Sequence, residues 1–93
     1  MSHPARYIAV YDISDDKERA KAAKILEGFG ERVQESVFEC YLSGNLRTRL
    51  LRRFEKLELK TGFLLLYRLQ ADTEPFRAGI CPPAMEQEYG FVL

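Results

Sequence analysis

The apolar residues of this chain recur with two different periods. Some runs are dense in β-branched, aromatic and aliphatic side chains, which favours buried β-strands. In other runs apolar residues return every three or four positions, which favours amphipathic helices. The runs of the first kind span 7–11, 32–42 and 63–69, and those of the second kind span 17–29 and 46–59.

The second strand-like run divides near Glu35-Ser36 into a short strand and a longer one. A final strand is predicted at Tyr89–Leu93. The order is therefore βαββαβ followed by a terminal strand. This order predicts an α+β fold of the ferredoxin-like type, in which two helices cover one face of a four-stranded antiparallel sheet.

The chain is predicted to form a single domain over 1–93, with 70–93 as a C-terminal arm. The arm is rich in proline up to residue 83 and ends in an apolar tail, which suggests that it packs on a partner subunit. The largely apolar run Phe63–Leu69 predicts a central strand that is covered on both faces.

Two helix starts carry capping signals. Asp15 and Glu18 have the spacing of a capping box, and Asp16 adds favourable negative charge in the first helical turn. The turn at Ser43-Gly44-Asn45 provides a cap for the second helix.

Composition indicates a soluble globular protein, with 46% apolar and 30% charged residues. The longest apolar run, Phe63–Tyr67, is far shorter than the roughly 18 residues that a membrane-spanning helix needs. The N-terminus lacks the pattern of a secretory signal, so we expect a cytoplasmic protein without a membrane partner. Two cysteines and a single histidine are too few for a four-ligand zinc site.

The net charge is zero, but the charge is distributed unevenly. Residues 43–60 contain six basic and two acidic residues, a local charge of +4. Cations at one-turn spacing on one helix face match the repeating charge of a nucleic-acid backbone, and such contacts are independent of base sequence. An ordinary solvated helix face is the alternative. The row consists of Arg49, Arg52, Arg53 and Lys56.

Asp12 is the sharpest chemical candidate. It follows the first apolar run in phase with Ile8 and Val10, so we expect it on the apolar side of the strand end, where a carboxylate needs a metal, a base or water. Mg²⁺ suits such an oxygen donor, and a two-fold axis could bring two Asp12 side chains together. The alternatives are a pair with Arg19 or a helix cap. Arg19 itself could reach Asp12 or a phosphate, or lie on the surface.

Three stretches together resemble one family. They are Tyr11-Asp12-Ile13-Ser14-Asp15-Asp16 with Arg19 downstream, Phe29-Gly30-Glu31-Arg32-Val33-Gln34, and Ser36-Val37-Phe38-Glu39-Cys40. In this order they resemble the CRISPR-associated protein 2 family, from about Arg6 to Leu69.

The resemblance implies a ferredoxin-like homodimer in the adaptation machinery of CRISPR systems. It further implies a Mg²⁺-dependent nuclease acting on RNA or DNA, and a central subunit of the spacer-integration complex between dimers of the CRISPR-associated protein 1 integrase. The family's metal-binding aspartate matches Asp12. Family positions tied to activity match Tyr11, Arg19, Arg32 and Phe38.

The expected function is therefore that of a CRISPR adaptation protein with a metal-dependent endonuclease activity. Three alternatives remain open at this level. The first is a non-catalytic scaffold that binds nucleic acid, the second a ferredoxin-like regulatory module for a small ligand, and the third a toxin-type endoribonuclease.

Overall fold

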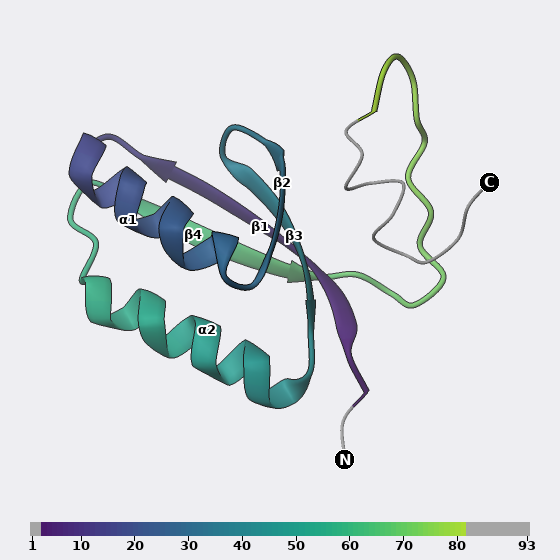
Figure 1. Ribbon diagram of the computed structural model, residues 1–93, viewed down its shortest axis with the longest axis horizontal. Coiled ribbons are helices and arrows are strands. Elements are labelled where there is room, and N and C mark those ends of the chain that lie inside the picture. The colour runs from purple at the N-terminus through teal and green to yellow at the C-terminus, as the bar shows by residue number, and fades with distance from the viewer. Residues whose placement is uncertain (1–2, 82–93) are drawn as a thin grey trace.

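The computed structural model describes residues 3–81. Its sheet has the strand order β2-β3-β1-β4, and every neighbouring pair is antiparallel (Figure 1). This arrangement confirms the ferredoxin-like prediction. The elements are β1 (Ala5–Ile13), α1 (Asp16–Glu27), β2 (Gly30–Gln34), β3 (Val37–Leu42), α2 (Gly44–Leu57) and β4 (Gly62–Arg68).

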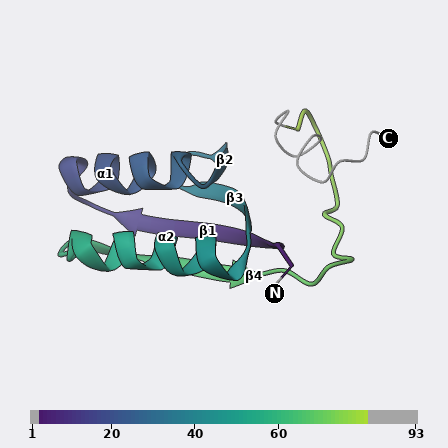
Figure 2. The same ribbon diagram turned by 60° about the horizontal axis from the view of Figure 1, so that its bottom comes forward.

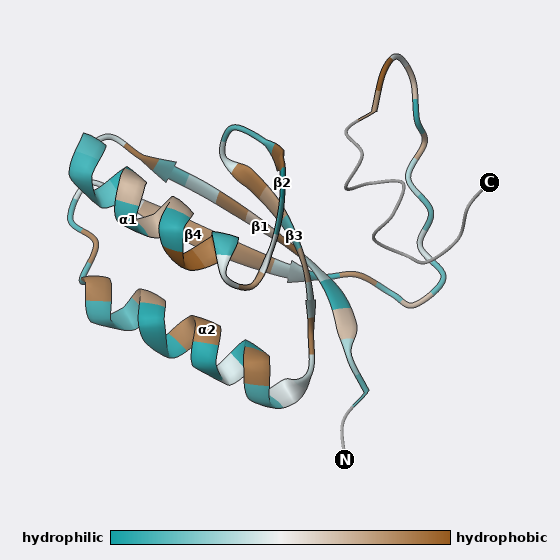
Figure 3. Cartoon of the chain, viewed as in Figure 1, coloured by the Kyte–Doolittle hydropathy of each residue, from teal (hydrophilic) through white to brown (hydrophobic). Residues whose placement is uncertain are grey.

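Both helices lie on one face of the sheet and run side by side along it (Figures 1 and 2). Alternate residues of β1, from Tyr7 to Ile13, point toward them and are buried. Hydrophobic and hydrophilic residues alternate along both helices (Figure 3), and the buried ones among the hydrophobic residues belong to this core. The largest fully buried side chains of this core are Phe38, Leu26, Leu42, Leu50 and Cys40.

The local signals in the sequence place the element ends well. Residues 35–36 form the turn between β2 and β3, as predicted. Asp15 caps α1, because its Oδ2 accepts a hydrogen bond from the Glu18 amide at 2.9 Å. Ser43 caps α2 in the same way, with the Leu46 amide as donor.

The prediction that 63–69 forms a central strand is wrong. Among residues 3–81, β4 is an edge strand that pairs only with β1, and the helices cover only one of its faces. Phe63, Leu65 and Tyr67 are therefore exposed on the other face. The apolar residues of β4 on this side belong to a face that residues 3–81 leave open.

Beyond β4, residues 69–81 form no helix or strand and leave the sandwich at the end where β1 begins (Figure 1). The predicted strand at Tyr89–Leu93 and the rest of the arm lie outside the described residues. The single-domain assignment of 1–93 thus stays a prediction. Within 3–81, no helix is long and apolar enough to cross a membrane.

Candidate functional site

Asp12 lies on the sheet face that the helices leave open. Successive strand residues point to opposite faces, and Asp12 shares its face with Ile8 and Val10, whereas Tyr11 and Ile13 point into the core. Its side chain is exposed. The expectation of a buried carboxylate is therefore wrong, because the apolar residues in phase with Asp12 belong to the uncovered face.

Neither structural alternative for Asp12 holds. Arg19 makes its ion pair with Asp16, and the cap of α1 is Asp15. Among the residues that the structure describes, no side chain forms a hydrogen bond or ion pair with the Asp12 carboxylate. Both of its oxygens are thus open to solvent, to an ion or to a ligand.

The surroundings of Asp12 are apolar. Across the β1–β4 ladder, Asp12 pairs with Phe63, and the next residues on that face pair as Val10 with Leu65 and Ile8 with Tyr67. Large apolar side chains of this open face are strongly exposed: Tyr41 by 52%, Phe63 by 49%, Leu65 by 43% and Tyr67 by 55%. A contiguous apolar surface of this kind marks an interaction site.

Arg19 is held at the end of β1 without touching Asp12. Its Nη1 donates to the carbonyl oxygens of Ile13 at 2.9 Å and Ser14 at 3.1 Å, while Nη2 pairs with Asp16. The guanidinium therefore fixes the strand end that carries Asp12. Its contacts make it a positioning residue in this chain.

Tyr11, Arg32 and Phe38 come together on the opposite face from Asp12. The Tyr11 hydroxyl and Arg32 Nη1 both donate to the Glu35 carbonyl oxygen, at 3.1 and 2.5 Å. The Arg32 guanidinium lies 4.9 Å from the centre of the Phe38 ring, which is 6.3 Å from the Tyr11 ring centre. These contacts hold the β2–β3 turn. The three side chains lie on one face of the sheet and Asp12 on the other, so the sheet separates them.

One group of contacts near Asp12 carries no signal in the sequence. The Glu18 carboxylate accepts hydrogen bonds from the amides of Lys60 and Thr61 and, at 2.6 Å, from the Thr61 hydroxyl. The Thr61 hydroxyl oxygen in turn accepts from the Asp15 amide at 3.0 Å. Glu18 therefore ties the start of α1 to the start of β4 instead of completing the capping box. Contacts between residues 42 or more positions apart cannot be found from local pattern.

These contacts lower the pKa of Glu18 below its ordinary value of 4.5, mainly through the Thr61 hydroxyl and then through the Lys60 amide. A carboxyl whose pKa is lower in the folded state stabilises the fold above its unfolded pKa, and this contribution is lost as the pH falls through the folded value. Glu18→Gln should therefore melt at a lower temperature than the wild type at pH 7, and the gap should close below pH 4.5.

Circular-dichroism melting curves from pH 7 to pH 3 test this expectation. Glu55→Gln, an exposed carboxylate on α2, is the matched control and should leave the pH profile unchanged. A constant gap between Glu18→Gln and the wild type at all pH values would contradict the assignment. The effect is modest, because the group lies at the surface where solvent screens charge.

The basic row lies on the outer face of α2. All four side chains are exposed, and the first turn of α2 contains no acid. Within the described part of the chain, none of these four side chains forms an ion pair. The row formed by Arg49, Arg52, Arg53 and Lys56 is thus available to a polyanion.

The residue pattern and fold match a known protein family. The family model for the CRISPR-associated protein Cas2 matches residues 5–74. The chain belongs to the Cas2 family. In the described part of this Cas2 protein, no three His, Cys, Asp or Glu side chains gather as a metal-binding group.

Individual relatives agree with this assignment. CRISPR-associated endonuclease Cas2 2 of Thermus thermophilus is 42% identical over 81 residues, which cover 86% of this chain and 90% of the relative. CRISPR-associated endoribonuclease Cas2 3 of Synechocystis is 51% identical over 72% of this chain and 74% of its own length. A crystal structure of a hypothetical protein from Thermus thermophilus superimposes with a TM-score of 0.74 at 41% identity, covering 85% of this chain and 95% of that one.

Proposed function

We propose that this Cas2 protein is a homodimeric, Mg²⁺-dependent endonuclease that also serves as a subunit of the spacer-integration complex in the cytoplasm. The observation that supports this proposal best is the unpaired Asp12 carboxylate at the edge of an exposed apolar sheet face. The relatives named endonuclease and endoribonuclease support the activity.

The open sheet face supports the dimer. Tyr41, Leu65 and Tyr67 are exposed in a single chain, and two such faces packed together would bury them. Packed sheets lie about 10 Å apart, so acidic side chains projecting from both faces can approach each other. A two-fold axis through this face relates Asp12 of one protomer to Asp12 of its partner.

The Asp12 carboxylate fits a magnesium ion by its chemistry. Mg²⁺ binds one or two carboxylates and keeps several waters, which an exposed, unpaired carboxylate permits. A bound ion lowers the pKa of a coordinated water and neutralises charge on a phosphodiester. Asp12 would hold the ion, and Arg19 anchors the end of the strand that carries Asp12 by donating to the Ile13 and Ser14 carbonyl oxygens. Tyr11, Arg32 and Phe38 support the activity by fixing the β2–β3 turn.

The basic row supports nucleic-acid binding by the same protomer. Arg49, Arg52, Arg53 and Lys56 offer sequence-independent contacts to phosphates, which suits either RNA or DNA as substrate. Such contacts also suit a subunit that spans duplex DNA between integrase dimers.

The C-terminal arm supports an extended interface. Within its described part, Phe76 and Ile80 are almost fully exposed, although both are large and apolar. We assign the arm, 70–93, to packing on the partner subunit. The CRISPR-associated protein 1 integrase is the proposed heterologous partner, on the basis of the family.

A single charge in the open face tests the dimer and the nuclease together. Leu65→Glu should give a monomer by light scattering and abolish Mg²⁺-dependent cleavage, because a buried unpaired carboxylate weakens the dimer by about 3–5 kcal/mol. Leu65 is exposed in the isolated chain, so the fold should persist.

Ala20→Glu introduces the same charge on an exposed position of α1 and serves as the control. It should remain dimeric and active. If Leu65→Glu stays dimeric and cleaves normally, the proposed interface is wrong. If it becomes monomeric but cleaves at the normal rate, the activity does not require paired Asp12 side chains.

A further inference from the structure

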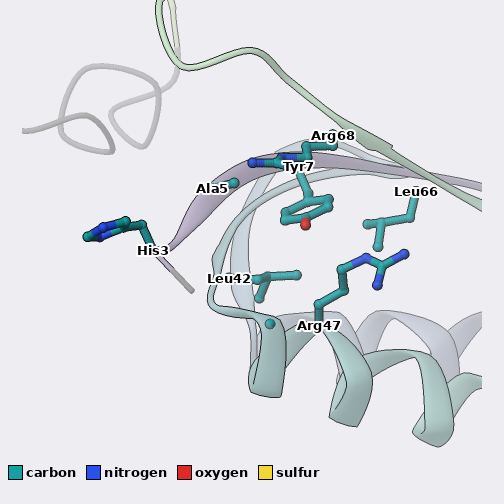
Figure 4. Close-up of a pocket in the computed structure, with 8 residues that line it drawn as sticks. His3, Ala5, Tyr7, Leu42, Arg47, Leu66 and Arg68 are labelled. Atoms are coloured by element: carbon teal, nitrogen blue, oxygen red, sulfur yellow. The ribbon is translucent and has the colours of Figure 1, made fainter. Parts of the chain in front are cut away.

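A second candidate site lies at the opposite end of β1 from Asp12. A pocket of about 440 Å³ opens between the start of α2 and the sheet (Figure 4). This volume falls within the roughly 300–1,000 Å³ of small-molecule sites. Its apolar side is formed by Leu42, Leu66 and the ring of Tyr7, and its polar side by Arg47, Arg68 and His3.

Two polar groups of the pocket point toward one another, and a third lies at its rim. In Figure 4 the Tyr7 hydroxyl and the Arg47 guanidinium both point into the space between the sheet and α2. Arg68 is the cross-strand partner of Tyr7 and lies beside it. The pocket thus has an aromatic hydroxyl and one guanidinium group inside it and a second guanidinium group, that of Arg68, at its rim. Guanidinium groups are well suited to hold a phosphate.

Arg47 is separate from the basic row. Each helical residue advances by about 100°, which places Arg47 roughly opposite Arg49, Arg52, Arg53 and Lys56, on the border facing the sheet. Within residues 3–81, no acidic residue lines the pocket, and neither Arg47 nor Arg68 forms an ion pair. The first turn of α2, which begins at the pocket residue Gly44, also lacks an acid. The helix dipole there therefore adds to the positive potential.

We propose that this pocket binds a nucleoside phosphomonoester, with the phosphate on Arg47 and Arg68 and the nucleoside against the apolar side. Such a group occurs at the 5′-phosphorylated end of a nucleic-acid strand and in a free mononucleotide. Binding of a nucleic-acid end rests on the proposed function, whereas binding of a free mononucleotide does not. The pocket is independent of Asp12, because Tyr7 and Asp12 point to opposite faces and are about 17 Å apart along β1 at 3.3 Å per residue.

The pocket also stays open in the proposed dimer. Tyr7, Leu66 and Arg68 belong to the helix-covered face, whereas the dimer uses the other face. A ligand could therefore reach the pocket in both protomers.

The test compares two labelled single-stranded oligonucleotides that differ only in a 5′-phosphate or a 5′-hydroxyl, by fluorescence anisotropy without divalent ions. Adenosine monophosphate is titrated separately by calorimetry. The wild type should prefer the phosphorylated end about tenfold, or bind adenosine monophosphate, or both. Arg47→Gln/Arg68→Gln should lose the preference and the mononucleotide binding, and keep its affinity for the hydroxyl oligonucleotide within about twofold.

Arg49→Gln/Arg52→Gln is the matched control, since it removes two charges from the basic row of the same helix. It should weaken binding of both oligonucleotides equally and keep the preference. A preference without mononucleotide binding identifies the strand end as the source, and the reverse identifies the free nucleotide.

No preference and no mononucleotide binding in the wild type would overturn the proposal, as would an unchanged preference in Arg47→Gln/Arg68→Gln. If neither oligonucleotide binds, the proposed nucleic-acid function fails, and the mononucleotide titration alone decides the pocket.

Discussion

Asp12→Asn should lower Mg²⁺-dependent cleavage on the order of 100-fold or more, because it removes the negative oxygen that holds the ion. The folded state should be unaffected, since the Asp12 side chain is exposed and its carboxylate makes no hydrogen bond or ion pair among the described residues. Changes at such positions stay within about 0.5 kcal/mol. Initial rates on labelled RNA and DNA across a Mg²⁺ titration measure the effect.

Asp16→Asn is the matched control. Asp16 is an exposed acid near the same strand end, but its carboxylate pairs with Arg19. It should retain most of the cleavage activity. Unchanged cleavage in Asp12→Asn would remove this residue from the mechanism.

The same Asp12→Asn variant separates the nuclease from the scaffold role when spacer acquisition is measured in cells. Acquisition requires the dimer and the basic row under the proposed function, and neither depends on the Asp12 carboxylate. Lost cleavage with normal acquisition would show that the integration role is the biological one. Loss of both would tie the carboxylate to integration.

Gly62→Ala should destabilise the fold by about 3 kcal/mol or more. Gly62 pairs with Ile13 across the β1–β4 ladder, and a Cβ there would lie 1.9 Å from the Asp12 carbonyl oxygen and 2.5 Å from the Ile13 Cα. Both neighbours are backbone atoms of a central strand, so they cannot move aside as a flexible side chain does. Overpacking of this kind typically costs 1–3 kcal/mol, and a clash with fixed backbone lies at or beyond its upper end.

Urea unfolding monitored by circular dichroism measures the loss. Gly28→Ala is the control, because its Cβ would meet only the Ile25 carbonyl oxygen at an ordinary 3.4 Å and its backbone is right-handed helical. Its stability should stay within about 1 kcal/mol of the wild type. Equal stability of both variants would mean that β4 can shift away from Asp12 without loss.

The local pattern of apolar and polar residues was sufficient to predict most of the fold. Helical spacing of apolar residues located α1 and α2, and the cap at Asp15 lies where the sequence placed it. The second helix begins at Gly44, two residues before the expected start, with Ser43 as its cap. The βαββαβ order gave the topology, because few packings satisfy that order. These features depend on residues close together in the chain, which a sequence displays directly.

The sequence by itself determined which residues share a face: Asp12 follows Ile8 and Val10, and the cations of α2 form one row. The tertiary structure alone decided which face of β1 the helices cover, and so left Asp12 exposed and set Tyr11, Arg32 and Phe38 on the other side. It also placed β4 at an edge and brought Thr61 to Glu18. The physical reason is that strand alternation is identical for both faces of a sheet, and only the packing of distant segments makes one of them the core.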